Sequence, residues 1–137
     1  MKPDRLEKIP LFAGLSEDEL KTLGGWTDEV EVPAGKFLVR QGAYPHEFMV
    51  IEDGTVEVTH DDTRLAELGP GDFFGEMALL SSHPRMASIV ALSDVRLVVM
   101  HERNFRAMEE SMPLVAERVR AVMDDRRKAD EERGIEP

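Results

Sequence analysis

The chain has 137 residues and contains no cysteine. This absence excludes a disulfide framework, a thiolate-bound iron–sulfur cluster, a zinc ribbon, a cysteine nucleophile and redox sensing by thiols. Long hydrophobic runs are also missing, because no stretch approaches the roughly 20 residues that span a bilayer. The N-terminal residues lack the apolar core of a secretory signal. We therefore expect a cytoplasmic protein with no membrane partner.

Positive charge is scarce as well. The chain has 28 acidic and 17 basic side chains, which gives a formal net charge of −11. A surface that displaces counterions from a nucleic acid needs clustered Lys and Arg, so we expect no nucleic-acid partner. The length is that of one domain with one sizeable core, and residues 1–137 are predicted to form a single domain.

Helical signals come first along the chain, in residues 1–25. Ser16 and Glu19 have the spacing of a capping box, so a helix is predicted to begin at Ser16. Gly24 and Gly25 then provide a stop signal. The N-terminal segment is therefore predicted to be helical.

Residues 26–100 show short apolar runs separated by turn residues at intervals of about 8 to 12 residues. Asp53-Gly54 is a strong tight-turn signal between two of these runs. Even spacing of this kind is typical of a mainly β protein, an antiparallel β-roll of the jelly-roll or double-stranded β-helix type. The predicted strands cover residues 30–32, 37–39, 48–51, 56–58, 65–68, 87–91 and 95–100.

Helical periodicity returns in residues 101–132. Phe105 and Met108 belong to a first predicted helix, and Pro113 is well placed to open a second. Beyond Met123 the sequence is almost wholly polar, which predicts a solvated helix end that frays into a tail at residues 133–137; an acidic interaction tail is the alternative. The apolar face ends too early for a dimerising coiled coil, so we expect a monomer or a weak homodimer.

Residues 71–91 contain the side chains that indicate a ligand. Gly75 precedes a short predicted helix starting at Glu76, and the free N–H groups at such a start favour an anion. Arg85 follows nine residues after Glu76, and its guanidinium can grip two phosphate oxygens. The Glu76 carboxylate would lie beside this anion site, so it needs a hydrogen-bond donor of its own. A pair of sugar hydroxyls on the ligand is a suitable donor. This pattern predicts that phosphate and ribose are bound side by side.

The same segment resembles the phosphate-binding cassette, here residues 74–89, of the cyclic nucleotide-binding domain. That family includes bacterial catabolite activators, cyclic-nucleotide-dependent kinases and gated channels, and the resemblance extends over nearly the whole chain. Its motif residues are the runs Phe74-Gly75-Glu76-Met77-Ala78-Leu79-Leu80 and Pro84-Arg85-Met86-Ala87-Ser88-Ile89.

The resemblance implies a role for each site residue. Glu76 would accept a hydrogen bond from the ribose 2′-hydroxyl, and Arg85 would pair with the cyclic phosphate. The N–H groups of Gly75, Met77 and Ala87 would line the anion, and the last helix would bring an apolar cap over the base. The expected ligand-binding residues are Gly75, Glu76, Met77, Ala78, Arg85, Met86, Ala87 and Ser88, with Val119 and Met123 as the cap.

Met86 bears on the choice of base. Family members that prefer cyclic GMP often have a hydroxyl residue there, and a thioether makes the guanine bond poorly, so cAMP is expected over cGMP. The resemblance implies a sensor without catalytic activity and without a cofactor. Its ligand would shift the last helix between open and closed positions. An effector protein, which the sequence does not identify, would respond to this movement of the helix.

Other interpretations stay open. Glu76 and Arg85 could form an ordinary salt bridge in a degenerate roll that acts as a protein-interaction module or senses a different ligand. A cupin-like metal enzyme would need clustered ligands, whereas the histidines are scattered along the chain. A transcription activator would need on the order of 60 further residues for a helix-turn-helix module. The four histidines are His46, His60, His83 and His101.

Overall fold

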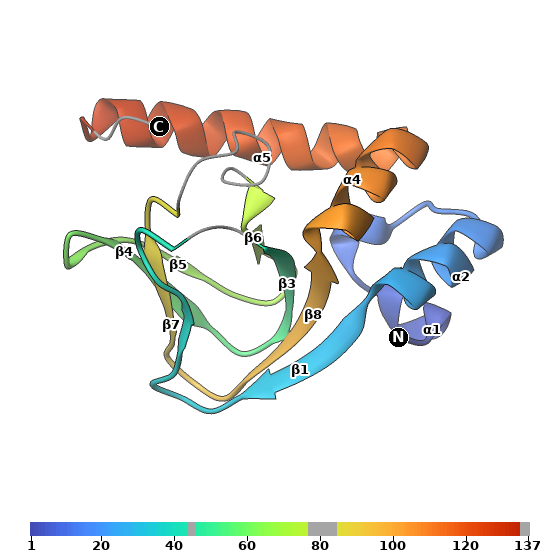
Figure 1. Ribbon diagram of the computed structural model, residues 1–137, viewed down its shortest axis with the longest axis horizontal. Helices are drawn as coiled ribbons and strands as arrows, with labels where there is room; N and C mark the ends of the chain where they lie inside the picture. The colour runs from blue at the N-terminus through green and yellow to red at the C-terminus, as the bar shows by residue number, and fades with distance from the viewer. Residues whose placement is uncertain (44–45, 77–84, 135–137) are drawn as a thin grey trace.

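The computed structural model describes residues 1–43, 46–76 and 85–134 (Figure 1). Over these residues, two antiparallel four-stranded sheets form a roll, with strand orders β1-β8-β3-β6 and β2-β7-β4-β5. The expected mainly β, antiparallel roll with helices at both ends is confirmed. The strands are β1 (Asp28–Val32), β2 (Phe37–Val39), β3 (Glu47–Asp53), β4 (Val56–His60), β5 (Thr63–Leu68), β6 (Phe73–Phe74), β7 (Ser88–Ala91) and β8 (Val95–His101).

Each predicted strand is present, and β6 is an addition that the sequence pattern did not predict. It pairs with β3 through Phe73 and Phe74 just before the cassette. The predicted turn between β3 and β4 is also confirmed, since Gly54 has a φ of +93°. A Cβ atom at Gly54 would lie 2.4 Å from the carbonyl oxygen of Asp94, so both the turn and this close approach require glycine.

The N-terminal segment forms α1 (Pro3–Glu7), the 3-10 helix η1 (Pro10–Phe12) and α2 (Glu17–Trp26). The capping box at the start of α2 is confirmed: the N–H of Glu19 donates to the Ser16 hydroxyl at 3.1 Å, and the Glu19 side chain accepts from Ser16 N–H at 3.0 Å. The helix ends at Trp26, one residue beyond the predicted stop signal, so Gly24 and Gly25 lie in its last turn. A Cβ atom at Gly24 would lie 2.5 Å from the Met1 carbonyl oxygen, so this glycine admits a neighbouring backbone.

Two helices follow the roll, α4 (Glu102–Ser111) and α5 (Pro113–Glu132). Phe105 and Met108 are buried in α4, and Pro113 is the first residue of α5, as predicted. Figure 1 shows α5 running along one side of the roll, with its first turns beside α4. The helix is continuous to Glu132, and its polar end is not merely solvated, because Arg126 donates to Glu76 and Arg133, just after the helix, donates to the Leu65 carbonyl.

Apolar side chains form two clusters. The first lies among the N-terminal helices, α4, the first half of α5 and one sheet, and the Phe48 and Phe105 rings meet in it with centroids 4.8 Å apart. The second cluster lies between the two sheets, around Ile51 and Leu97. Each fully buried side chain of this size contributes about 1.5 to 3 kcal/mol. The first cluster therefore fixes the start of α5 against the roll.

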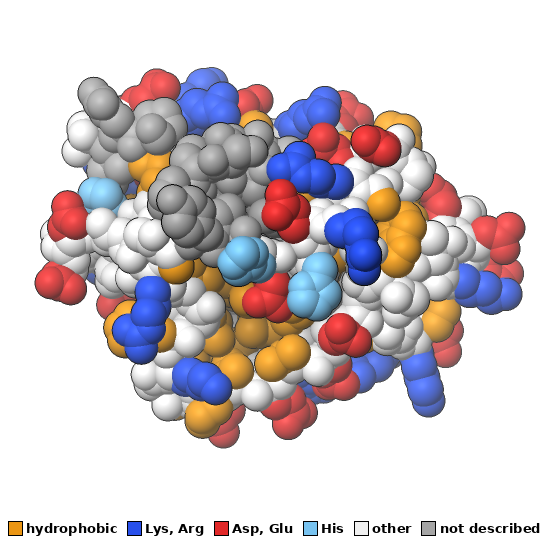
Figure 2. Space-filling model, in the orientation of Figure 1, with side chains coloured by type: hydrophobic (Ala, Val, Ile, Leu, Met, Phe, Trp, Pro, Cys, Tyr) orange, Lys and Arg blue, Asp and Glu red, His pale blue; other side chains and the backbone are white. Residues whose placement is uncertain are grey.

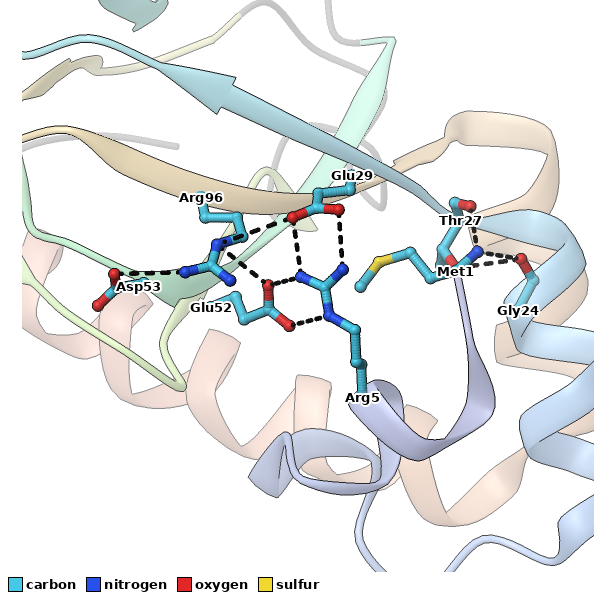
Figure 3. Close-up of polar contacts among 8 residues, drawn as sticks. All are labelled: Met1, Arg5, Gly24, Thr27, Glu29, Glu52, Asp53 and Arg96. Atoms are coloured by element: carbon cyan, nitrogen blue, oxygen red, sulfur yellow. Dashed lines mark hydrogen bonds and ion pairs between the residues drawn. The ribbon is translucent and has the colours of Figure 1, made fainter.

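An ion-pair network ties α1 to three strands (Figure 3). The Arg5 guanidinium donates two hydrogen bonds of 2.8 Å to Glu29 of β1 and others to Glu52 of β3. Arg96 of β8 lies 3.7 Å from Glu29 and 3.6 Å from both Glu52 and Asp53. The network therefore holds the N-terminal segment against one sheet.

Charges of both signs share the surface. Figure 2 shows Lys and Arg side chains interspersed with Asp and Glu on the face in view. In the described part of the chain, no helix combines the length and apolarity needed to cross a membrane.

Candidate functional site

A cavity of about 400 Å³ lies between the second sheet, the cassette and α5. This volume is within the range of small-molecule sites. Its sheet wall is apolar, whereas the cassette and α5 bring charged groups to it. The wall residues from the sheet include Val39, Val58, Leu65, Leu68 and Ile89; those from α5 are Val122, Asp125, Arg126, Ala129 and Asp130, followed by Arg133.

Glu76 is 1% exposed at the cassette end of this cavity. Its Oε1 accepts a hydrogen bond from Arg126 Nη1 at 2.6 Å. Its Oε2 is buried and has no hydrogen-bond partner among the described residues. A buried carboxylate oxygen without a donor is costly, so this atom is a ready acceptor for a ligand hydroxyl.

Arg85 is 8% exposed and lines the same cavity. Its Nη1 donates to the Gly75 carbonyl at 3.1 Å and its Nη2 to the Glu47 carbonyl at 2.6 Å. Desolvation lowers the pKa of Arg85, although the nearby Glu76 and Glu47 carboxylates act in the opposite direction. A guanidinium has five N–H donors and stays charged, so the site holds a buried cation with donors remaining for an anion.

Backbone contacts fix the position of Arg85. Its N–H donates to the Ala43 carbonyl and its carbonyl accepts from Gly42 N–H, both at 2.7 Å. Gly75 has a φ of +103°, and a Cβ atom there would lie 2.7 Å from the Glu47 carbonyl oxygen and 2.9 Å from Arg85 Nη1. Glycine at this position therefore leaves room for the Arg85 side chain.

The other cassette residues divide into two groups. Met86 and Ala87 line the cavity, and the Met86 carbonyl accepts a hydrogen bond from His60 Nδ1 at 2.7 Å. Ser88 does not line it, because its hydroxyl accepts from Gln41 N–H at 2.8 Å and so joins β7 to the chain beyond β2. Met77 and Ala78 lie outside the described residues.

The expected cap residues on α5 do not line the cavity. Val119 is 2% exposed in the first apolar cluster, because the start of α5 packs on the N-terminal helices. Met123 is half-buried and also absent from the cavity wall. Val122 and charged residues further along α5 occupy the place of the expected cap. Sequence reasoning missed the charged residues because it treated the polar end as solvated, although Arg126, Ala129 and Arg133 continue the helical spacing of Val122.

Two charged groups lie at the C-terminal end of this wall, Asp130 of α5 and Arg133, which directly follows the helix. Arg133 Nη2 donates to the Leu65 carbonyl of β5 at 3.1 Å. Desolvation raises the pKa of Asp130, which Arg133, His60 and Arg126 lower to a smaller extent. Across residues 1–43, 46–76 and 85–134, no group of three or more His, Asp or Glu side chains is arranged to hold a metal ion.

Fold and site together define a ligand-binding roll that presents a buried guanidinium and a buried carboxylate in one cavity. The family model of the cyclic nucleotide-binding domain matches residues 29–111. The chain belongs to this family, which confirms the resemblance seen in the cassette.

Several known proteins are similar to the chain. The cyclic AMP receptor protein of Thermus thermophilus is 35% identical over 127 residues, which are 88% of this chain and 59% of that protein. A cyclic nucleotide-gated potassium channel of Rhizobium etli is 35% identical over 87% of this chain, but the match covers 33% of the channel. The chain thus spans about a third to three fifths of these relatives.

Solved structures agree with this placement. The catabolite activator protein of Thermus thermophilus superposes with a TM-score of 0.76 at 35% identity, covering 90% of this chain and 61% of that one. The cAMP-bound PfPKA-R structure gives a TM-score of 0.88 at 21% identity, covering 99% of this chain and 47% of that one, and so shows the shared fold. The chain is thus similar to the Thermus protein in sequence and fold, and to PfPKA-R in fold.

Proposed function

We propose that this chain is a non-catalytic sensor that binds cAMP in preference to cGMP and signals through α5 to an effector protein. One observation carries the proposal: Arg85 and Glu76 are both buried at one cavity, and the free oxygen of Glu76 lacks a donor among the described residues. A cyclic nucleotide supplies an anion for the first group and a ribose hydroxyl for the second. The name of the Thermus receptor supports cAMP as the ligand.

Binding would proceed through complementary contacts. The cyclic phosphate takes the N–H donors of Arg85 that the two carbonyls leave free, and its charge offsets the desolvation of the guanidinium. The ribose 2′-hydroxyl donates to Glu76 Oε2. The base lies against the apolar sheet wall beside Met86, whose thioether favours adenine over guanine. No cofactor takes part in this scheme.

Movement of α5 would carry the signal. The ligand contacts α5 and the cassette together, so it stabilises the arrangement in which the helix covers the cavity. A tenfold shift toward that arrangement needs about 1.4 kcal/mol of differential binding, which is within the range of a single charge-assisted hydrogen bond. The proposal includes an effector protein that reads α5, a cytoplasmic location, and a chain that is a monomer or a weak homodimer.

Calorimetric titration with cAMP tests the proposal. The wild-type chain should bind cAMP saturably and more tightly than cGMP, and Arg85→Ala should weaken binding by about 100-fold or more, because two charge-assisted bonds are lost. Arg64→Ala is the matched control, since Arg64 is an exposed residue of β5 that pairs with Glu67 away from the cavity. Circular dichroism should show that each variant is folded.

Three results would contradict the proposal. If Arg85→Ala and wild type bind cAMP with equal affinity, Arg85 does not bind the phosphate. If the wild-type chain binds cGMP more tightly than cAMP, the proposed base preference is wrong. A wild-type chain that binds neither nucleotide would favour the degenerate roll that serves as a protein-interaction module.

A further inference from the structure

The two oxygens of the Glu76 carboxylate have different environments. Oε1 is bound by Arg126 of α5 at 2.6 Å, whereas Oε2 is buried without a partner among the described residues. The carboxylate thus contacts the C-terminal helix through one oxygen, while the other oxygen remains available at the cavity that Glu76 lines. A charge this deeply buried needs a counter-charge, and Arg126 provides it at bonding distance.

Arg126 is itself held in place from a second side. The carbon atom of its guanidinium lies 5.2 Å from the centroid of the Phe73 ring, within range of a cation–π contact. Phe73 is 5% exposed in β6, the short strand just before the cassette. The guanidinium therefore has two defined contacts on the roll, and Arg126 is a fixed link between α5 and Glu76.

Arg85 does not replace this link. Its two recorded hydrogen bonds go to the Gly75 and Glu47 carbonyls, and its contribution to Glu76 is a longer-range attraction. The two arginines therefore have separate partners at one cavity: Arg85 donates to two backbone carbonyls, and Arg126 donates to the Glu76 carboxylate.

We propose that Arg126 is a positioning residue that aims the free oxygen of Glu76 at the ribose 2′-hydroxyl, so that recognition of the sugar depends on α5 covering the cavity. This inference rests on the proposed function and specifies how the site distinguishes ribose from deoxyribose. A guanidinium bound to Oε1 restricts the carboxylate to one orientation, and that restriction lasts while α5 is in place. A nucleotide with the 2′-hydroxyl therefore favours the covered arrangement more than one without it.

The test compares cAMP with 2′-deoxy-cAMP by calorimetry. The wild-type chain should bind cAMP about 10- to 100-fold more tightly, which corresponds to one hydrogen bond to a charged group. In Arg126→Gln this ratio should fall to about threefold or less, because Glu76 is no longer held toward the sugar. Arg126→Lys keeps a charge but not the planar fork, so it should restore part of the ratio.

Arg133→Gln is the matched control. Arg133 directly follows the same helix, lines the same cavity and donates to the Leu65 carbonyl, whereas Glu76 accepts from Arg126. Loosening α5 at Arg133 should weaken both nucleotides by the same factor and leave their ratio at the wild-type value. If Arg126→Gln behaves in this way, Arg126 only holds the helix and the inference is wrong.

A second pair of variants, Glu76→Gln with and without Arg126→Gln, leaves no buried carboxylate without a partner. This pair tests the inference even if Arg126→Gln alone does not fold. Glu76→Gln should have a low ratio by itself, and adding Arg126→Gln should not change it, because both residues act through one contact. A further fall in the double variant would overturn the inference. A wild-type chain that binds neither nucleotide would instead overturn the proposed function, and the inference with it.

Discussion

The two halves of α5 differ in burial: the first half adds apolar side chains in a buried cluster to its polar contacts, which run from Arg118 to the carbonyls of Leu11 and Ala13. In the first half, Val115 and Val119 are buried in the cluster that includes the N-terminal helices and α4. In the second half, the polar contacts to the roll are the Arg126–Glu76 pair and the hydrogen bond from Arg133 to Leu65. Apolar burial is lost only when the core opens, whereas a few polar contacts can be exchanged for ligand or water. Under the proposed function, the first half is the fixed part of the helix, and the second half is the part whose contacts a ligand would change.

The largest expected loss of stability comes from disrupting the packing of the first half of α5. Val119→Asp places a charge without a partner in the first apolar cluster, and we expect it to lower the free energy of unfolding by at least about 3 kcal/mol. Denaturant unfolding measures this loss. The same change at Ala121, which is exposed on α5, should stay within about 0.5 kcal/mol. Similar losses at both positions would mean that the start of α5 is not packed as described.

The next effect concerns the second half. Arg126→Met leaves the buried Glu76 carboxylate without its counter-charge, which should cost about 2 kcal/mol of unfolding free energy. Adding Glu76→Gln removes that charge, so it should return most of the loss. Denaturant unfolding of the single and double variants measures both changes. An Arg126→Met variant as stable as wild type would show that the pair contributes nothing to holding α5.

A smaller effect is expected where the N-terminal segment, on which the first half of α5 packs, meets the sheet. Arg5→Met removes the pairs with Glu29 and Glu52, so the thermal midpoint should fall slightly at low salt and less at about 1 M salt, where such pairs are screened. Hydrogen bonds from Arg5 hold the pKa of Glu29 below its usual range. The stabilisation is thus present above the unfolded pKa of Glu29 and is lost as pH falls through the lower folded value. A decrease in midpoint that does not depend on salt would contradict this account.

The smallest expected effect concerns Asp130 in the second half of α5. Here stability depends on pH in the direction opposite to that given for Glu29. The pKa of Asp130 is raised by desolvation, so the folded state binds the proton more readily than the unfolded state does. Stability therefore falls as pH rises through the interval from the unfolded to the folded pKa. Asp130→Asn should be slightly more stable than wild type at neutral pH, by less than about 1 kcal/mol because the side chain is partly solvated, and equal to it at about pH 3. Thermal midpoints of Asp130→Asn and wild type at both pH values measure this difference. An Asp130→Asn variant less stable than wild type at neutral pH would contradict the prediction.

Much of the fold could be predicted because its signals are local. Turn residues such as Gly54 and apolar alternation located the seven strands, and Ser16 with Glu19 located the start of α2. The strand β6 was missed because two residues are too few to show a period, and its pairing partner in β3 lies more than 20 residues away. The contact at Gly24 could not be predicted because it depends on the approach of Met1, which no local pattern reveals.

The candidate site shows the same division. Gly75, Glu76, Arg85, Met86 and Ala87 could be predicted because the cassette is one short motif, and the structure brings them to one cavity. The α5 contribution could not be predicted in the same way. Arg126 is 50 residues from Glu76 in sequence, and an arginine in a polar helix is most often solvated. The identity of its partner depends on how the helix lies across the roll.

The most direct measurement is a crystal structure of the wild-type chain grown with saturating cAMP. We expect the cyclic phosphate within hydrogen-bond distance of the Arg85 guanidinium and the ribose 2′-hydroxyl on Glu76 Oε2, with α5 over the base. A nucleotide bound with its phosphate away from Arg85, or a cavity that remains empty at saturating ligand, would contradict it.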